Sequence, residues 1–571
     1  MYYKPMSLNL LYIRFVLEYL LERPDLLSQL RPLGLDLFNT HLQDFSVKFD
    51  ERQRRKTKRQ LAYLRSFENS NMSSSQRLSY NVLEYFTNES LNRQLSETFF
   101  CHHYLINQLF GAQTEIIALL TKYHRIKNIK EAEAYLLRVQ RISLAFDQLI
   151  EQQKKRRENG IETPRFVLER VVNDLKIFRD QLSTEPNQSP LVFTFVDKLK
   201  ENNLPLDKRS SLITRLLTVI KTFVIPAYAR LITMLENELS RSTTDHGVYQ
   251  LPSGDIYYRL CLQFHTTTDM TPDEIHQLGL TQVDKIQKQI KTNVIKELEK
   301  DPIHQYNKHD VENSRKQILD DYIQIIADID SKMDAFFSPS CLPKNKCSRI
   351  PVFKEEGSPA AHYFPPALDG TSKGTFFVNL RKIDEITKFK MRTLAYHEAV
   401  PGHHFQLSVA QSMKHLPLFR RIIQFTAYTE GWALYTETFA AENNFQSYWL
   451  DYIGYLDAML MRAVRLVVDT GIHSKQWSRE QATEYMMKNT CMHRTEVVTE
   501  IDRYFVLPGQ ACAYMVGCLK ILSLRQKAQD ALKTKFDIKK FHEAVLVHGC
   551  LPLTLLEQVI DDYIEREKQN F

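Results

Sequence analysis

The amino-acid sequence predicts a mainly α-helical protein with one small β-sheet, and two observations support this. Glycine is scarce, at 16 of 571 residues, and a chain with so few residues suited to left-handed turns favours helices over tight β-turns. Apolar residues also recur at three- and four-residue spacing along most of the chain, which is the period of a helix with one buried face. The chain is too long for a single small core, so we expect two lobes.

The first half of the chain is a succession of predicted helices. It begins with Leu8 to Leu21, where Arg14 and Glu18 interrupt the apolar residues. This pattern predicts an amphipathic helix and not a signal peptide or a membrane span. Polar breaks separate the helical patterns that follow. The clearest of these lie over residues 76–86, 131–152 and 211–237.

The pattern changes after residue 245. Helices are predicted over Gly254–His265 and Thr271–Lys300, and the second opens with Thr271-Pro272-Asp273-Glu274, an N-terminal capping signal with proline at the first helical position. Residues 374–380 combine β-branched and aromatic residues behind a glycine and predict a strand. We therefore place an N-terminal helical region at 1–245 and a second region at 246–571, with the small sheet just before a helix of unusual sequence.

Charge and cysteine content narrow the classes of partner. The formal net charge is only +7, and basic runs such as residues 52–56 are expected to be solvated helix faces and not nucleic-acid sites. The eight cysteines show neither a CxxC pair nor a disulfide-framework spacing, and several lie in apolar stretches as small buried residues do. We expect a cytoplasmic protein with no nucleic-acid or membrane partner, while its oligomeric state is not set by the sequence.

The unusual helix carries a metal-site pattern with an insertion. Residues 397–404 read His-Glu-Ala-Val-Pro-Gly-His-His. In the common HExxH pattern, two histidines four residues apart on one helix face bind a metal, and the glutamate polarises the bound water. Here Pro401 occupies the position of the second histidine and prevents a regular helix. A bulge that absorbs Pro401-Gly402 would bring His403 to the ligand position, with His404 as the alternative.

A second segment adds two glutamates. Glu430 and Glu437 are seven residues apart, so they share one face of a helix two turns long. A buried carboxylate is costly unless it is paired or bound to a metal. We interpret Glu430 as the third metal ligand and Glu437 as a carboxylate that orients one of the histidines. The alternative is a pair of glutamates on a solvated helix face.

Several longer segments resemble a known family. They are HEAVPGHHFQ (397–406), EGWALYTE (430–437), RAVRLVVDTGIH (462–473) and RYFVLPGQACAYMVG (503–517). Together they resemble a large family of bacterial metallopeptidases catalogued as domain of unknown function 885, most strongly from about residue 250 to 560. That family is in turn distantly similar to the gluzincin peptidases of the thimet oligopeptidase and Taq carboxypeptidase types. In those, a helix with HExGH precedes a helix with a ligand glutamate and another glutamate seven residues later.

The resemblance implies a Zn²⁺ site held by His397, His403 and Glu430, with Glu437 and His404 around the ligands. Gly402-His403 matches the last two residues of HExGH, which favours His403 over His404 as ligand. The inserted proline is the departure from that pattern. The resemblance also implies a gluzincin-like architecture, with the site in a cleft between two lobes.

Hydrolysis by a metal-activated water builds an oxyanion that needs a hydrogen-bond donor besides the metal. Tyr514 and His473 lie in the family-like segments and are the candidates, although either could simply be a packed side chain. Arg465 and Arg503 could bind a substrate carboxylate or pair with neighbouring acids such as Glu500.

We assign Asn379, at the end of the predicted strand, to substrate binding, because an extended peptide could add to this sheet edge.

These features predict a zinc metallopeptidase whose catalytic region is 246–571. Glu398 is expected to act as general base and then as general acid, on a peptide substrate. A metal-dependent hydrolase of a non-peptide amide is one alternative, and a metal-free binding scaffold that keeps the fold is another. The sequence does not distinguish endopeptidase from exopeptidase activity, nor does it give the residue specificity.

Overall fold

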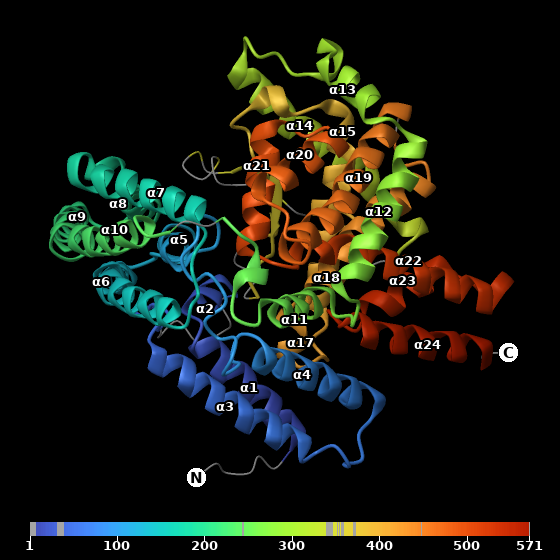
Figure 1. The fold of residues 1–571 in the computed structure, drawn as a ribbon, viewed down its shortest axis with the longest axis horizontal. Helices are drawn as coiled ribbons and strands as arrows, with labels where there is room; N and C mark the ends of the chain where they lie inside the picture. The colour runs from blue at the N-terminus through green and yellow to red at the C-terminus, as the bar shows by residue number, and fades with distance from the viewer. Residues whose placement is uncertain are drawn as a thin grey trace. The chain divides into compact units, whose positions relative to one another are not determined.

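The structure is a computed structural model, and its described residues are mainly helical (Figure 1). Described are residues 7–30, 39–242, 245–338, 346–350, 352, 355, 359–368, 373–446 and 448–569. Within them one three-stranded sheet accompanies the helices, which confirms the predicted fold class at this level. The chain forms two compact units, one of residues 1–65, 90–245 and 367–369, the other of residues 66–89, 246–366 and 370–571.

The first unit is built from helices whose apolar faces form its core. In α6, for example, Val139, Ile142, Phe146 and Leu149 recur at helical spacing and are fully buried. The helices are α1 (Leu8–Leu21), α2 (Pro24–Leu30), α3 (Val47–Arg65), α5 (Ala112–Ala118), α6 (Ile129–Glu158), α7 (Arg165–Thr184), α8 (Pro190–Glu201), α9 (Leu206–Val219) and α10 (Ile225–Leu239).

The second unit contains the sheet and the remaining helices. Most of α4 (Ser74–Asn92) belongs to it, although that helix lies early in the sequence. The other helices are α11 (Gly254–Thr266), α12 (Pro272–Gln289), α13 (Thr292–Lys300), α14 (Val311–Asp330), α15 (Lys388–Glu398), α16 (His403–Ser412), α17 (Leu418–Ile422), α18 (Thr426–Glu442), α19 (Trp449–His473), α20 (Arg479–Asn489), α21 (Arg494–Val506), α22 (Ala513–Leu532), α23 (Ile538–Leu546) and α24 (Leu553–Gln569).

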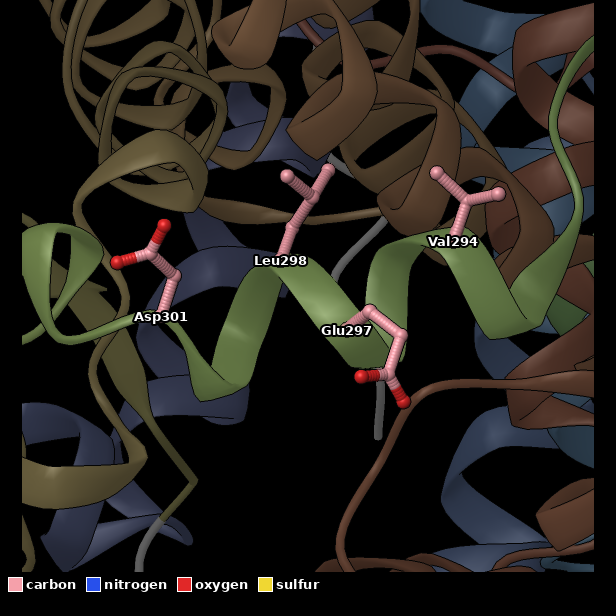
Figure 2. A pocket seen from close by; sticks show the side chains of 4 residues that line it. All are labelled: Val294, Glu297, Leu298 and Asp301. Carbon is pink, nitrogen blue, oxygen red and sulfur yellow. The ribbon is translucent and has the colours of Figure 1, made fainter.

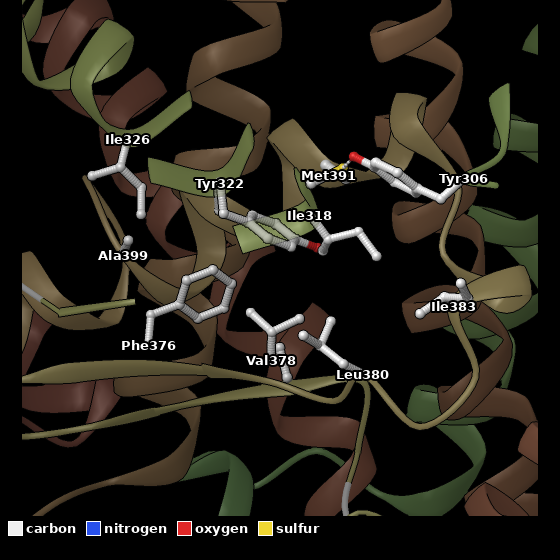
Figure 3. Close-up of a cluster of buried hydrophobic side chains, with 12 residues drawn as sticks. Tyr306, Ile318, Tyr322, Ile326, Phe376, Val378, Leu380, Ile383, Met391 and Ala399 are labelled. Atoms are coloured by element: carbon white, nitrogen blue, oxygen red, sulfur yellow. Dashed lines mark hydrogen bonds between the residues drawn. The ribbon is translucent and has the colours of Figure 1, made fainter. Parts of the chain in front are cut away.

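The sheet supports α15, the helix that ends in His397 and Glu398. Its strands are β1 (Lys346–Arg349), β2 (Ala361–Phe364) and β3 (Thr375–Val378), in the order β1-β3-β2, with β1 parallel and β2 antiparallel to β3. Phe376 and Val378 alternate onto the buried face, where they meet Tyr322 of α14 and Met391 of α15 (Figure 3). The predicted strand is therefore confirmed, and so is its place beside this helix.

Local sequence signals set several element boundaries. α1 spans Leu8–Leu21 as the apolar pattern predicts, and Thr271 and Glu274 form a reciprocal capping box at the start of α12. The predicted helix to Lys300 is instead two helices, because α12 ends at Gln289 and α13 begins at Thr292. The pattern over 211–237 lies within a continuous helical stretch in which π-helical residues 220–224 join α9 to α10.

One helix of the described residues, Leu206–Leu239, is long and apolar enough to cross a membrane. The bent pair Arg494–Val506 and Gln510–Lys535 would count as a second candidate if it formed one span. Core helices of ordinary globular proteins also meet these criteria of length and composition, so this finding is weak evidence for a membrane span.

Candidate metal centre

The centre begins at the end of α15, where the chain leaves the helix. His397 and Glu398 are buried in its last turn, α15 ends at Glu398, and α16 starts at His403. The sequence predicts a bulge or kink within one helix at Pro401. The structure instead has two helices separated by Ala399–Gly402, because proline both removes a donor and clashes with the preceding turn.

Gly402 allows this break to fold tightly against α15. A Cβ at this position would lie 1.9 Å from the carbonyl oxygen of His397, so a larger residue would push the break away from the helix end. The indole Nε1 of Trp432 donates a hydrogen bond to the carbonyl oxygen of Pro401 at 2.9 Å and holds the break from the α18 side. The result is that the rings of His397 and His403 lie with centroids 4.8 Å apart and nearly perpendicular.

α18 places two carboxylates on opposite sides of His397. Oε2 of Glu430 lies 3.5 Å from Nε2 of His397 and 3.3 Å from Nε2 of His403. Oε1 of Glu437, two turns later, accepts a hydrogen bond from Nδ1 of His397 at 2.7 Å. Three potential ligand atoms therefore converge, and the second nitrogen of His397 is held by a fully buried carboxylate.

The convergence point fits a tetrahedral metal. Ligand bonds of about 2.0–2.1 Å to histidine nitrogen and carboxylate oxygen put neighbouring ligand atoms of a tetrahedron about 3.3–3.4 Å apart. The two nitrogen–oxygen distances to Glu430, 3.5 and 3.3 Å, are close to this length. The carboxylate of Glu398 also lies near, since His397, Glu398 and His403 offer ligand atoms within 4.8 Å of one another. Both carboxylates are thus at hand, and Oε2 of Glu430 lies within 3.5 Å of a nitrogen of each histidine.

Electrostatics favour a cation at this point. Burial alone would lower the pKa of His397, but hydrogen bonds to Glu430 and Glu437 raise it to about 10. Burial would raise the pKa of Glu430, but the neighbouring His403 and His397 hold it well below its ordinary value. Oε2 of Glu398 is buried without a hydrogen-bond partner. The cluster is therefore rich in negative charge, which a proton on His397 or a metal ion would balance.

Tyr514 reaches the same place from α22. Its ring lies parallel to that of His397 with centroids 6.4 Å apart. This position depends on a close crossing of α18 and α22, since a Cβ on Gly431 would lie 2.5 Å from the Cα of Gly517. Gly431 follows Glu430 directly, and Gly517 is one turn beyond Tyr514, so the crossing brings these two side chains to one site.

The phenol oxygen of Tyr514 accepts hydrogen bonds from two side chains. Nη2 of Arg503 donates at 3.2 Å and Nε2 of Gln510 at 3.5 Å. The guanidinium of Arg465 lies over the tyrosine ring, 4.6 Å from its centroid. Sequence reasoning missed Gln510, although its spacing of four residues from Tyr514 in a helical region is a usable signal. It also missed Trp432, whose place two residues after Glu430 is another.

Three predicted site residues have other roles, and these predictions are corrected. His473 accepts a hydrogen bond at Nδ1 from the backbone N–H of Val248 at 3.1 Å and donates from Nε2 to the carbonyl oxygen of Tyr504 at 2.9 Å. Both nitrogens are used, and burial lowers the pKa of His473 to about 4, so the ring is neutral. It packs helices together and has no donor to offer to an oxyanion.

Arg465 and Asn379 are also used internally. Arg465 pairs with Glu500 at 2.8 Å and donates to the hydroxyl of Tyr504 at 3.1 Å, which is the alternative that the sequence left open. Asn379 donates to the carbonyl oxygen of Glu355 at 2.7 Å and accepts from the N–H of Arg381 at 3.1 Å. Neither side chain is free for a substrate, because each already has its partners within the fold.

His404 contacts the sheet and its own helix. Its Nδ1 lies 2.9 Å from the hydroxyl of Tyr363 in β2 and 3.3 Å from that of Ser408. It therefore ties the start of α16 to the sheet, while His403 is the histidine that contacts Glu430.

Two open hollows of the described surface lie away from this cluster. One of about 340 Å³ beside α13 is lined by Val294, Glu297, Leu298 and Asp301, with Glu297 on a different side of the helix from Leu298 (Figure 2). Another of about 490 Å³ is lined by residues of α12, α18 and α19. Neither includes a residue of the histidine–glutamate cluster, so the cluster stands on its own geometry.

Comparison with known proteins gives one family and structural relatives. The family described as "Bacterial protein of unknown function (DUF885)" matches residues 29–560. "The crystal structure of the putative lipoprotein from Colwellia psychrerythraea" has 28% identity and a TM-score of 0.91, over 98% of each chain. A structure named as a putative lipoprotein of unknown function from Shewanella oneidensis has 17% identity and a TM-score of 0.70, over 96% of this chain and 98% of that one, and shows the fold alone. No curated protein matches significantly.

We predict that removing the carboxylate from the buried ion pair beside Tyr514 destabilises the fold by several kcal/mol. Burial would raise the pKa of Glu500, but Arg465 and Arg503 lower it to about 2. Glu500→Gln should lower the free energy of unfolding by about 3 kcal/mol at pH 7, because it leaves Arg465 buried without its carboxylate. Since the folded-state pKa lies below the ordinary 4.5, this difference should be full above about pH 4.5 and shrink toward pH 2.

The measurement is urea unfolding of both proteins between pH 3 and 8. Glu297→Gln is the matched control, because Glu297 pairs with Lys300 at a similar distance of 2.8 Å but on the surface, where such pairs contribute about 1 kcal/mol or less. An equal effect of the two substitutions would contradict the prediction.

Proposed function

The chain belongs to the DUF885 family, and we propose that it is a zinc-dependent peptidase with a gluzincin-like centre. The proposal rests on one observation, the convergence of Nε2 of His397, Nε2 of His403 and Oε2 of Glu430 at tetrahedral spacing. Three protein ligands of these types with a fourth position left open are the arrangement of catalytic zinc sites. Zinc also suits the charge, because its binding would displace the proton from His397.

Each ligand would be oriented by its surroundings. Glu437 accepts the Nδ1 proton of His397 and so directs the lone pair of Nε2 toward Glu430. The break at Gly402 aims His403 at the same point. A zinc ion bound there would supply the Lewis acidity that makes water nucleophilic near neutral pH. A peptide is the substrate class that the resemblance to oligopeptidases and carboxypeptidases favours.

Glu398 is the proposed proton carrier. Its carboxylate is mostly buried next to both histidines, and its Oε2 has no hydrogen-bond partner. It would accept a proton from the attacking water and then donate it to the leaving nitrogen. An acceptor that is already desolvated and unpaired needs little rearrangement to take that proton.

Tyr514 is the proposed donor to the oxyanion. Because its oxygen accepts from Arg503 and Gln510, its own proton remains available to donate. The two accepted hydrogen bonds also fix the direction of the phenol, which preorganises it for a developing negative charge. Arg503 would thus act through Tyr514, and its contact with Glu500 at 3.4 Å holds it there.

The cysteines and the structural relatives bear on the cellular compartment of the protein. The cytoplasmic location expected from the sequence rests on the lack of a recognised signal peptide or membrane span and on the cysteines. The seven cysteines in the described residues are free thiols, six of them buried. Buried thiols are shielded in any compartment, and the names of both structural relatives describe lipoproteins. These relatives therefore favour a lipid-anchored or exported protein.

The first prediction separates the ligand from the proton carrier. Purified protein should contain about one zinc per chain, as a site with three protein ligands does. Glu398→Gln should keep the metal but lose about 10²–10⁴ in rate on a peptide. Glu437→Gln should weaken zinc binding about 10–100-fold, and Glu430→Gln should weaken it more. Metal content would be measured by mass spectrometry after dialysis.

Equal zinc retention in the Glu430→Gln and Glu398→Gln proteins would contradict the assignment of Glu430. A parent protein that binds zinc but cleaves no peptide would favour a non-peptide amide as substrate. A parent that binds no metal at all would favour a binding scaffold.

The second prediction distinguishes the two adjacent histidines. His403→Ala should abolish zinc binding, because it removes a nitrogen that faces Glu430. His404→Ala should leave the zinc content close to that of the parent, because His404 contacts Tyr363 and Ser408 instead. The reverse ranking, measured by competition with a chromogenic chelator, would mean that the break at Gly402 presents the other ring.

The third prediction concerns Tyr514. Tyr514→Phe should keep the fold, the zinc and the KM while lowering kcat by about 10²–10³, the usual effect of removing one oxyanion donor. Tyr455→Phe is the control, since it removes another buried hydroxyl, one that contacts Thr438. Steady-state kinetics on a short fluorogenic peptide would test both. A raised KM with unchanged kcat would mark Tyr514 as a ground-state binding residue.

A further inference from the structure

The first unit exposes a row of apolar side chains along α1. The row consists of Leu10, Ile13, Leu17 and Leu21, which are 45%, 57%, 41% and 37% exposed. Their spacing of three or four residues places them on one face of the helix. The opposite face packs into the unit through residues such as Leu11 and Phe15. A contiguous apolar surface of this kind usually marks an interaction site.

A row of basic side chains runs along the neighbouring helix. It consists of Lys48, Arg52, Arg55 and Arg59 of α3, all exposed and spaced by three or four residues. α3 as a whole carries eight basic and two acidic side chains. Of the nearby acids, Asp44 pairs with Arg52 at 3.5 Å, and Glu51 is exposed on the same helix. The face of α3 therefore has a strong excess of positive charge.

The two rows adjoin on one surface. Nε2 of Gln60 donates to Glu18 at 2.7 Å, and Lys56 forms an ion pair with Glu22. These contacts join α1 and α3 side by side and antiparallel, as Figure 1 shows. At 100° per residue, Arg52 and Arg59 lie about 40–60° round the helix from Lys56, on the side away from the buried residues. The basic row thus begins where the contact with α1 ends.

We propose that α1 and α3 form a face that docks this protein on an anionic lipid surface. An amphipathic helix lying in a membrane interface inserts an apolar row and places basic residues at the phosphate groups, and each such residue near an anionic leaflet strengthens binding severalfold. This arrangement suits a bilayer better than a second copy of the chain, because two copies of the face would bring their basic rows together.

This inference departs from the expectation that the protein has no membrane partner. In the basic run at residues 52–56, Arg52 and Arg55 are exposed as the sequence predicts, whereas Arg54 donates to backbone carbonyls and Lys56 pairs with Glu22. The exposed basic row adjoins an apolar row on α1 that sequence periodicity alone assigns to the core. The face lies entirely within the first unit, so the proposal stands or falls independently of the metal centre.

The test is co-sedimentation of the full chain with vesicles. The protein should bind vesicles of phosphatidylcholine with about 30% phosphatidylglycerol more tightly than vesicles of phosphatidylcholine alone, and salt should weaken the binding. Lys48→Gln with Arg55→Gln should weaken binding to the anionic vesicles about thirtyfold. Ile13→Gln with Leu17→Gln should weaken binding to both kinds of vesicle, because it removes the inserting side chains.

The matched control is Leu144→Gln with Ile177→Gln. It removes two apolar side chains from α6 and α7 that are 60% and 61% exposed, at least as much as Ile13 and Leu17. It should bind vesicles as the parent does. The proposal is overturned if the parent does not bind anionic vesicles at low salt, or if both α1–α3 double variants bind them as tightly as the parent. It is also overturned if the parent dimerises without binding vesicles and the Ile13→Gln, Leu17→Gln protein is monomeric.

Discussion

The carboxylates of one helix hold His397 from both sides, and the rest of the centre depends on this constraint. Glu430 and Glu437 lie two turns apart on α18, about 10 Å along the helix, and their side chains converge on the two nitrogens of the imidazole between them. For both contacts to form, α18 must lie against the end of α15. Gly431 allows α22 to pack closely on α18. The break at Gly402 lets α16 begin close to the end of α15.

The same residues therefore pack the centre and balance its buried charge. Trp432 is fully buried and donates to the carbonyl oxygen of Pro401, so the same side chain packs the core and fixes the break. Glu437 is fully buried, which would be costly for an isolated carboxylate. Its hydrogen bond from His397 and the nearby guanidinium of Arg462, at 3.7 Å, offset that cost. A cation bound between His397, His403 and Glu430, as proposed, would balance the remaining negative charge.

The sequence predicted what local patterns encode. The bounds of α1, the capping box of α12 and the central strand follow from periodicity and from short-range hydrogen bonds. The seven-residue spacing of Glu430 and Glu437 likewise placed both on one side of α18. Pro401 signals locally that the helix is disrupted, but the sequence did not predict that α15 ends at Glu398 and α16 begins at His403. One contact that holds this break comes from Trp432, which is distant in sequence from Pro401.

The corrected residues have the same origin. His473 and Arg465 lie in a family-like segment and Asn379 ends the predicted strand, yet their partners are Tyr504, Glu500 and Glu355, which no local pattern connects to them. Such residues hold other parts of the fold in place and would not themselves touch a substrate. Glu500 binds both Arg465 and Arg503, and Arg503 donates to the phenol of Tyr514, so the direction of that phenol depends on a buried ion pair. Motif resemblance alone does not separate side chains that would touch a substrate from side chains that hold them in place, because both kinds occur in the same sequence segments.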